Sequence, residues 1–70
     1  MNKNVAGFVI FVIEKVAAKF FGGNKRSAYC SMRDAGTLAR LAKDYDVEHS
    51  LGLDIILEGV KADLDSKEMM

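Results

Sequence analysis

The chain has no proline, one cysteine, one histidine and no net charge. Average usage would place about three or four prolines in a chain of this length. Because β-sandwiches and barrels rely on proline and glycine in their many turns, the absence of proline favours a helical fold. A single cysteine excludes an internal disulfide framework, and one Cys with one His leaves a zinc site almost without its preferred ligands. The sequence therefore predicts an all-α protein with no metal and no cofactor.

Charge and hydropathy exclude two further classes. Ten basic and ten acidic residues and a pI near 6.5 argue against a protein that coats nucleic acid or an anionic membrane. The apolar run near the start is about nine residues long, against about 20 for a membrane-spanning helix. Glu14 and Lys15 interrupt it and no A-x-A cleavage site follows, which disfavours a secretory signal peptide. We expect a cytoplasmic protein without a membrane segment.

Seventy residues accommodate one domain, here residues 1–70, with order expected over about 5–65. Half of the residues are hydrophobic and 29% are charged, which is typical of globular proteins. A core of this size usually supplies only ~3–5 kcal/mol, so self-association is expected.

The segment from about Val5 to Phe21 is predicted to be a helix rather than a strand. Its apolar run does not separate the two by itself, but strong helix-forming residues follow at 14–19 and Gly22 stands where a helix ends. On a helix, one broad face carries Val5, Phe8, Val9, Val12, Ile13, Val16 and Phe20.

Three apolar residues, Ile10, Phe11 and Phe21, fall outside that face. They add more apolar surface than a 70-residue monomer easily covers. We predict that they form the surface of a homo-oligomer, most simply a dimer.

Three further helices complete a compact array of about four. The second spans Lys25 to Asp34 and ends at Gly36. The residues expected to cap the four helices are Asn4, Asn24, Thr37 and Ser50. The inward residues expected after the first helix are Ala28, Tyr29, Met32, Leu38, Leu41, Ala42, Leu53, Ile55, Ile56, Leu57, Val60 and Leu64. Residues 65–70 are expected to fray.

Charge is segregated along the chain. Residues 1–43 hold eight Lys or Arg and two Asp or Glu, a balance of +6, and residues 44–70 hold the reverse, a balance of −6. Either the two halves attract each other, within the fold or between subunits, or the acidic half is presented to a basic partner.

The only histidine, His49, follows Tyr45 by four residues and Asp46 by three, so all three side chains meet if this segment is helical. An imidazole beside a carboxylate is part of the arrangement that general acid–base catalysis uses. However, no motif ties a nucleophile to it and no second metal ligand of the HExxH kind exists. We interpret His49 as a structural residue bonded to a nearby carboxylate or backbone group. Cys30 is interpreted as a small buried hydrophobe.

Four basic residues recur at intervals of seven, seven and three: Arg26, Arg33, Arg40 and Lys43. A small helix-turn-helix DNA-binding regulator would use such a stripe on phosphates, and this is the alternative function. The helix that would enter the DNA groove lacks an obvious base-reading set of side chains and the net charge is zero, so nucleic acid is the less favoured partner.

The run from Phe8 to Glu14, the approach from Leu41 to Tyr45 and the pattern Y-D-x-x-H-[ST]-x-G-x-x-x-I at 45–56 resemble a family of short all-helical bacterial proteins of unknown function. The similarity covers about residues 5–65. Glu48 stands where that family has a hydrophobic residue, and Ala35 precedes Gly36 where Tyr is typical.

Such proteins are often encoded near toxin-like domains, some of which look like ADP-ribosyltransferases. The resemblance implies a helical partner or antitoxin-like role, with Glu14, Tyr45, Asp46 and His49 carried over as motif positions without assigned catalysis. The expected function is thus a non-enzymatic protein-interaction module, with a protein partner encoded nearby.

Overall fold

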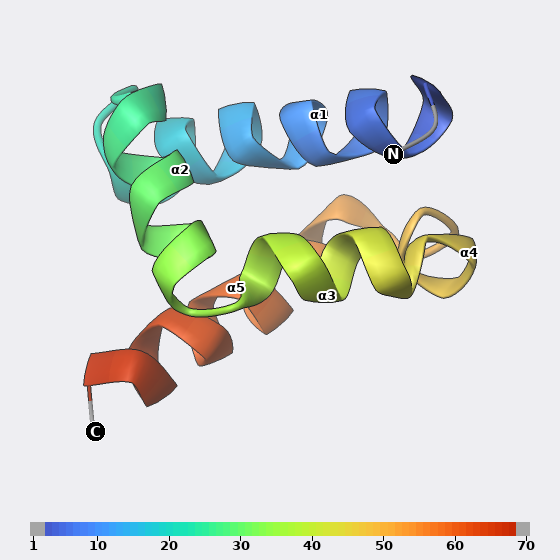
Figure 1. Ribbon diagram of the computed structural model, residues 1–70. Helices are drawn as coiled ribbons and strands as arrows, with labels where there is room; N and C mark the ends of the chain where they lie inside the picture. Colours follow the sequence, from blue (N-terminus) through green and yellow to red (C-terminus); the bar gives the residue numbers. More distant parts are fainter. Residues whose placement is uncertain (1–2, 69–70) are drawn as a thin grey trace.

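The computed structural model describes residues 3–68, and over that range the chain forms α-helices and no strand (Figure 1). The helices are α1 (Lys3–Phe20), α2 (Lys25–Asp34), α3 (Thr37–Lys43), α4 (Tyr45–Glu48) and α5 (Leu53–Glu68). The Cα radius of gyration is 11.1 Å, close to the value of about 11 Å that a compact domain of this length should have. The predicted all-α, compact array is confirmed.

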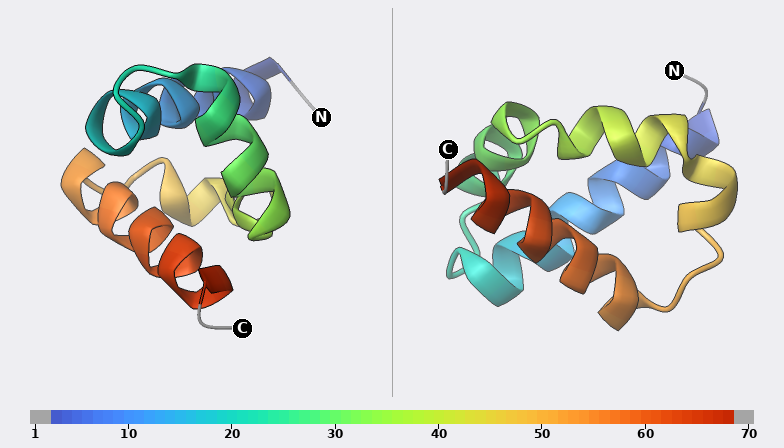
Figure 2. Two further views of the ribbon diagram at one scale, coloured as in Figure 1. Left: turned by 90° about the vertical axis from the view of Figure 1, so that its left-hand side faces the viewer. Right: turned by 90° about the horizontal axis from the view of Figure 1, so that it is seen from below.

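The helices follow one another around a common centre. α1 crosses the top of Figure 1, α2 descends at one end, and α3 returns beneath α1 towards its first residues. α4 lies at that end, where the ring of Tyr45 meets the ring of Phe8 edge-on with centroids 5.5 Å apart. Figure 2 shows α5 closing the array from below, packed against α1 and α2.

The core lies where α1, α2, α3 and α5 converge. Its buried residues are Val9, Val12, Val16, Ala17, Ala28, Met32, Leu41, Ile56, Leu57 and Val60. Partly buried side chains surround it: Val5, Phe8, Ile13, Phe20, Phe21, Leu38, Leu53 and Leu64. The predicted inward face of the first helix is therefore the face that packs.

Two residues expected inside lie outside. Tyr29 is 43% exposed and its ring lies beneath the Arg33 guanidinium, while Ile55 is 52% exposed in the first turn of α5. Conversely, Phe21 packs against the core, because the chain turns back after α1 and brings the ring onto the bundle. Ile10 and Phe11 are exposed, as expected.

Of the four residues predicted to cap helices, one does so and three do not. The Asn24 side chain accepts a hydrogen bond from the Ser27 amide at 3.0 Å and caps α2 as predicted. Asn4 is already inside α1, so it is not the cap. Gly36 takes the N-cap position of α3 in place of Thr37, which is itself helical and fully buried. Ser50 lies three residues before α5, and its hydroxyl donates to carbonyls at the end of α4.

Left-handed glycines make the two tight turns. Gly22 ends α1 with φ +61°, and the amide of Gly23 (φ +90°) donates to the Ala17 carbonyl at 2.8 Å. Gly36 (φ +78°) ends α2 and starts α3, so α3 leaves in a new direction after a two-residue link.

The second half of the chain contains one helix more than expected. Residues 45–48 form the short helix α4, where the sequence indicated only an interruption. Helix α5 continues to Glu68. The prediction that the chain frays after Leu64 is therefore wrong for residues 65–68, which are helical. Residues 69–70 lie outside the described residues.

Candidate functional site

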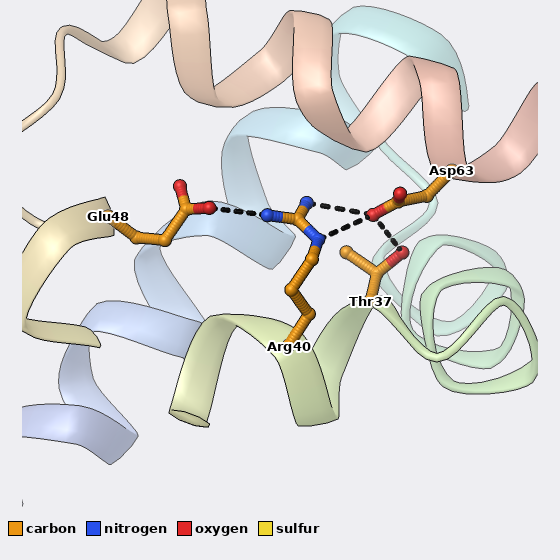
Figure 3. A network of polar contacts seen from close by, with 4 residues as sticks. All are labelled: Thr37, Arg40, Glu48 and Asp63. Atoms are coloured by element: carbon orange, nitrogen blue, oxygen red, sulfur yellow. Dashed lines mark hydrogen bonds and ion pairs between the residues drawn. The ribbon is translucent and has the colours of Figure 1, made fainter. Parts of the chain in front are cut away.

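A polar network joins three helices around the guanidinium of Arg40 (Figure 3). Arg40 projects from α3 towards Asp63 on α5, and its Nε and Nη2 donate to one Asp63 oxygen at 3.0 and 2.7 Å. On its other side, Nη1 donates to Glu48 of α4. The Thr37 hydroxyl donates to the same Asp63 oxygen at 3.1 Å. One arginine therefore links α3, α4 and α5.

These groups are partly withdrawn from water. The exposed fraction of the side chain is 32% for Arg40, 28% for Asp63 and 12% for Glu48. Burial by itself lowers the pKa of Arg40, but the hydrogen bond and charge of Asp63, followed by those of Glu48, outweigh burial and leave this pKa above its usual value. Arg40 is a permanent cation held between two carboxylates.

The network accounts for part of the charge segregation. Arg40 belongs to the basic residues 1–43, and both of its partners belong to the acidic residues 44–70. Attraction between the halves within the fold was one of the two predicted explanations. Thr37, Glu48 and Asp63 were not predicted to act together, because the hydrogen bonds of the network join residues 8 to 26 positions apart and such separations carry no local signal.

The motif at 45–49 is only partly assembled. The His49 ring stacks on the Tyr45 ring, with centroids 4.4 Å apart and planes 13° from parallel. His49 Nδ1 lies 2.6 Å from the Tyr45 carbonyl oxygen, and because a carbonyl only accepts, Nδ1 is the donor. This is a backbone contact of the kind expected for a structural histidine. No hydrogen bond or ion pair between Asp46 and His49 is found in the described part of the chain, although the Asp46 carbonyl accepts from Ser50.

Glu14, the fourth motif residue, does not join them. Its carboxylate pairs with Lys25 at 3.6 Å, across the turn between α1 and α2, with both side chains largely exposed. The four residues carried over from the resemblance therefore form no common site.

The predicted basic stripe is interrupted at two positions. The Arg40 guanidinium forms ion pairs with Asp63 and Glu48, and Arg33 Nε pairs with Asp34 at 3.2 Å. Arg33 also lies over the ring of Tyr29. Charge-compensated guanidiniums bind phosphates less strongly than free ones, so this arrangement is unfavourable to the DNA-binding alternative.

Apart from Tyr29 on α2, the large exposed apolar residues occur in two stretches of the chain. The first is on α1 and comprises Ile10 and Phe11. The second follows α3, where Val47, Leu51 and Ile55 are 64%, 37% and 52% exposed. Asp46 and Asp54 immediately precede two of them and are also exposed. We call Asp46, Val47, Leu51, Asp54 and Ile55 the acidic apolar face. Val47 and Leu51 were not among the predicted surface residues, although they lie four residues apart in the sequence.

Other chemistry finds little support in residues 3–68. No group of three or more His, Cys, Asp or Glu side chains in this range is arranged to hold a metal ion. Cys30 is half-buried on α2. Across the same residues, no helix combines the length and hydropathy needed to cross a bilayer.

A scan of protein-family models finds no match to this chain, and neither curated proteins nor solved structures give one. The resemblance drawn from the motif at 45–56 remains a prediction.

Proposed function

We propose that this protein is a non-enzymatic bacterial protein-interaction module that acts in the cytoplasm as a homodimer. In this proposal it is the antitoxin-like partner of a toxin-like protein encoded nearby. The observation that carries the proposal is the acidic apolar face, where three large hydrophobic side chains are exposed beside carboxylates.

Apolar side chains exposed as a group are typical of surfaces that bind another protein. Fully burying an exposed side chain of this size is worth ~1.5–3 kcal/mol. Because Val47, Leu51 and Ile55 are 64%, 37% and 52% exposed, each can contribute only about that share of the value. The surrounding carboxylates favour a basic partner surface and disfavour acidic ones. A basic nucleotide- or RNA-binding cleft on a toxin-like protein has the required charge.

The test is site-specific photo-crosslinking in the bacterium that encodes the protein. A photo-reactive residue replaces Ile55 in the acidic apolar face, and in the control it replaces Lys61, exposed further along α5. From position 55 we expect a crosslinked species that mass spectrometry identifies as a basic protein other than this chain, beside any product with a second copy, and we expect none from position 61.

The same experiment separates the competing outcomes. A product that contains peptides of this chain alone identifies self-association, whereas peptides of a second protein identify a different partner. Equal crosslinking from both positions, or enrichment of specific DNA without any protein, would refute the proposed partner.

A further inference from the structure

The acidic apolar face runs from α4 through the link to the first turn of α5. Backbone hydrogen bonds run from the Val47 amide to Asp44 and from the Leu51 amide to Glu48, so the chain keeps coiling from α4 to the start of the link with α5. Leu51 thus stands about one turn after Val47. Ile55 follows in the first turn of α5, and all three side chains are exposed.

This face is negative without internal compensation. Residues 44–60 contain no lysine or arginine. Glu48 is neutralised by Arg40, but Asp46 and Asp54 form no ion pair with any side chain that the structure describes. A complementary surface would offer apolar side chains and free cations.

The chain itself carries such a surface on α1. Phe11, Lys15 and Lys19 recur every four residues, so they lie along one side of the helix, and all three are exposed. The Lys15 ammonium lies 5.5 Å from the centre of the Phe11 ring, and neither lysine pairs with a carboxylate among the described side chains. We call these three residues the basic face of α1.

We infer that the acidic apolar face of one copy binds the basic face of α1 of a second copy. The contact places Phe11 among Val47, Leu51 and Ile55, with Lys15 and Lys19 opposite Asp46 and Asp54. This inference rests on the self-association part of the proposed function and is independent of the toxin-like partner.

Charge decides between this contact and the simplest rival, in which α1 packs on α1. The rival brings Lys15 and Lys19 of one copy close to the same lysines of the other, and like charges in an interface are unfavourable. The contact between unlike faces pairs opposite charges instead. A basic partner protein binds the same face, so its binding displaces the second copy from this contact.

The test uses two charge-reversal variants. Asp46→Lys/Asp54→Lys alters the acidic apolar face, and Lys15→Glu/Lys19→Glu alters the basic face of α1. Sedimentation equilibrium measures their association at micromolar concentration and about 0.05 M salt, where screening is weak. Circular dichroism confirms that each variant is folded, and Asp46→Asn/Asp54→Asn is a milder second variant of the acidic face.

We expect the wild type to associate and each double reversal to weaken association at least about tenfold. An equimolar mixture of the two reversals should regain wild-type association, because every contact between unlike variants again pairs opposite charges. The matched controls Asp65→Lys and Lys61→Glu reverse single exposed charges elsewhere on α5 and should leave association unchanged.

Three results would overturn the inference. A monomeric wild type refutes both the inferred contact and the proposed homodimer. It leaves the crosslinking test of a different partner intact. Loss of association in the lysine variant but not in either aspartate variant indicates contact between two copies of α1. Failure of the mixture to associate shows that the two faces do not bind each other.

Discussion

The α1–α2 pair and the α3–α5 part of the molecule share one apolar core, but α3, α4 and α5 are also joined by a polar network. Between α1 and α2, fully buried apolar side chains such as Val12, Val16 and Met32 fill the contact. Around α3, α4 and α5, Arg40 bridges Glu48 and Asp63. Apolar packing depends on volume and is indifferent to charge, whereas the network depends on each charged partner being present. The two parts should therefore fail under different substitutions.

The largest effect is expected from Met32→Ala in the apolar part. Met32 is fully buried, and removing a buried side chain of this size costs ~2–5 kcal/mol. Because a domain of this length has only ~3–5 kcal/mol in total, the variant should be mostly unfolded at 25 °C. Circular dichroism with urea titration measures this. Ser27→Ala, at an exposed position of the same helix, should unfold like the wild type, and a fully folded Met32→Ala would contradict the comparison.

The next largest effect is expected from Arg40→Met in the polar part. The change keeps most of the apolar stem but leaves two partly buried carboxylates without a counter-charge. Discounted for their exposure, the loss should be ~1–2 kcal/mol. Hydrogen exchange should accelerate in α4 and α5 more than in α1, and uniform acceleration would contradict a local role. Arg33→Met, whose ion pair is at the surface, is the matched control and should show no such pattern.

A smaller effect is expected from Thr37→Val, which keeps the shape of a fully buried side chain and removes its hydroxyl. Asp63 then loses one of its donors, and a single hydrogen bond is worth ~0.5–1.5 kcal/mol. Thermal unfolding should show a Tm lowered by several degrees. Combined with Arg40→Met, the loss should be less than the sum of the two, because both act on Asp63. Strict additivity would show that they act separately.

A still smaller effect is expected from His49→Ala at the edge of the polar part. The ring is exposed, and its contacts are the Tyr45 carbonyl and the stacked Tyr45 ring. Their loss should cost about 1 kcal/mol or less and lower Tm by a few degrees. Lys61→Ala is an exposed control with no expected change. An unchanged Tm combined with lost partner binding would show that His49 acts in recognition rather than in structure.

The same division explains which features could be predicted. The apolar part follows local rules: the spacing of Val9, Val12 and Val16 fixes a helix face, and Asn24 and Gly22 mark helix boundaries within a few residues. The extent of α2 was therefore predictable to the residue.

The polar part depends on residues far apart in the sequence. Thr37 has the chemistry of a helix cap, and only the position of Asp63, 26 residues later, directs its hydroxyl elsewhere. Ile55 fits a helical stripe by spacing, but the direction of α5 turns it outward. Periodicity defines a face without showing what covers it.

The smallest effect, close to zero, concerns pH. The pKa of Arg40 is raised above its usual value, because the hydrogen bond and charge of Asp63 and then the charge of Glu48 outweigh the lowering by burial. A cation with a raised pKa contributes its full stabilisation below its unfolded pKa and loses it only as pH rises through the still higher folded value. The Tm difference between wild type and Arg40→Met should therefore be the same at pH 7 and at about pH 9.5, because arginine stays protonated throughout that range. A difference that shrinks by pH 9.5 would show that Arg40 is not the cation that holds α3, α4 and α5 together.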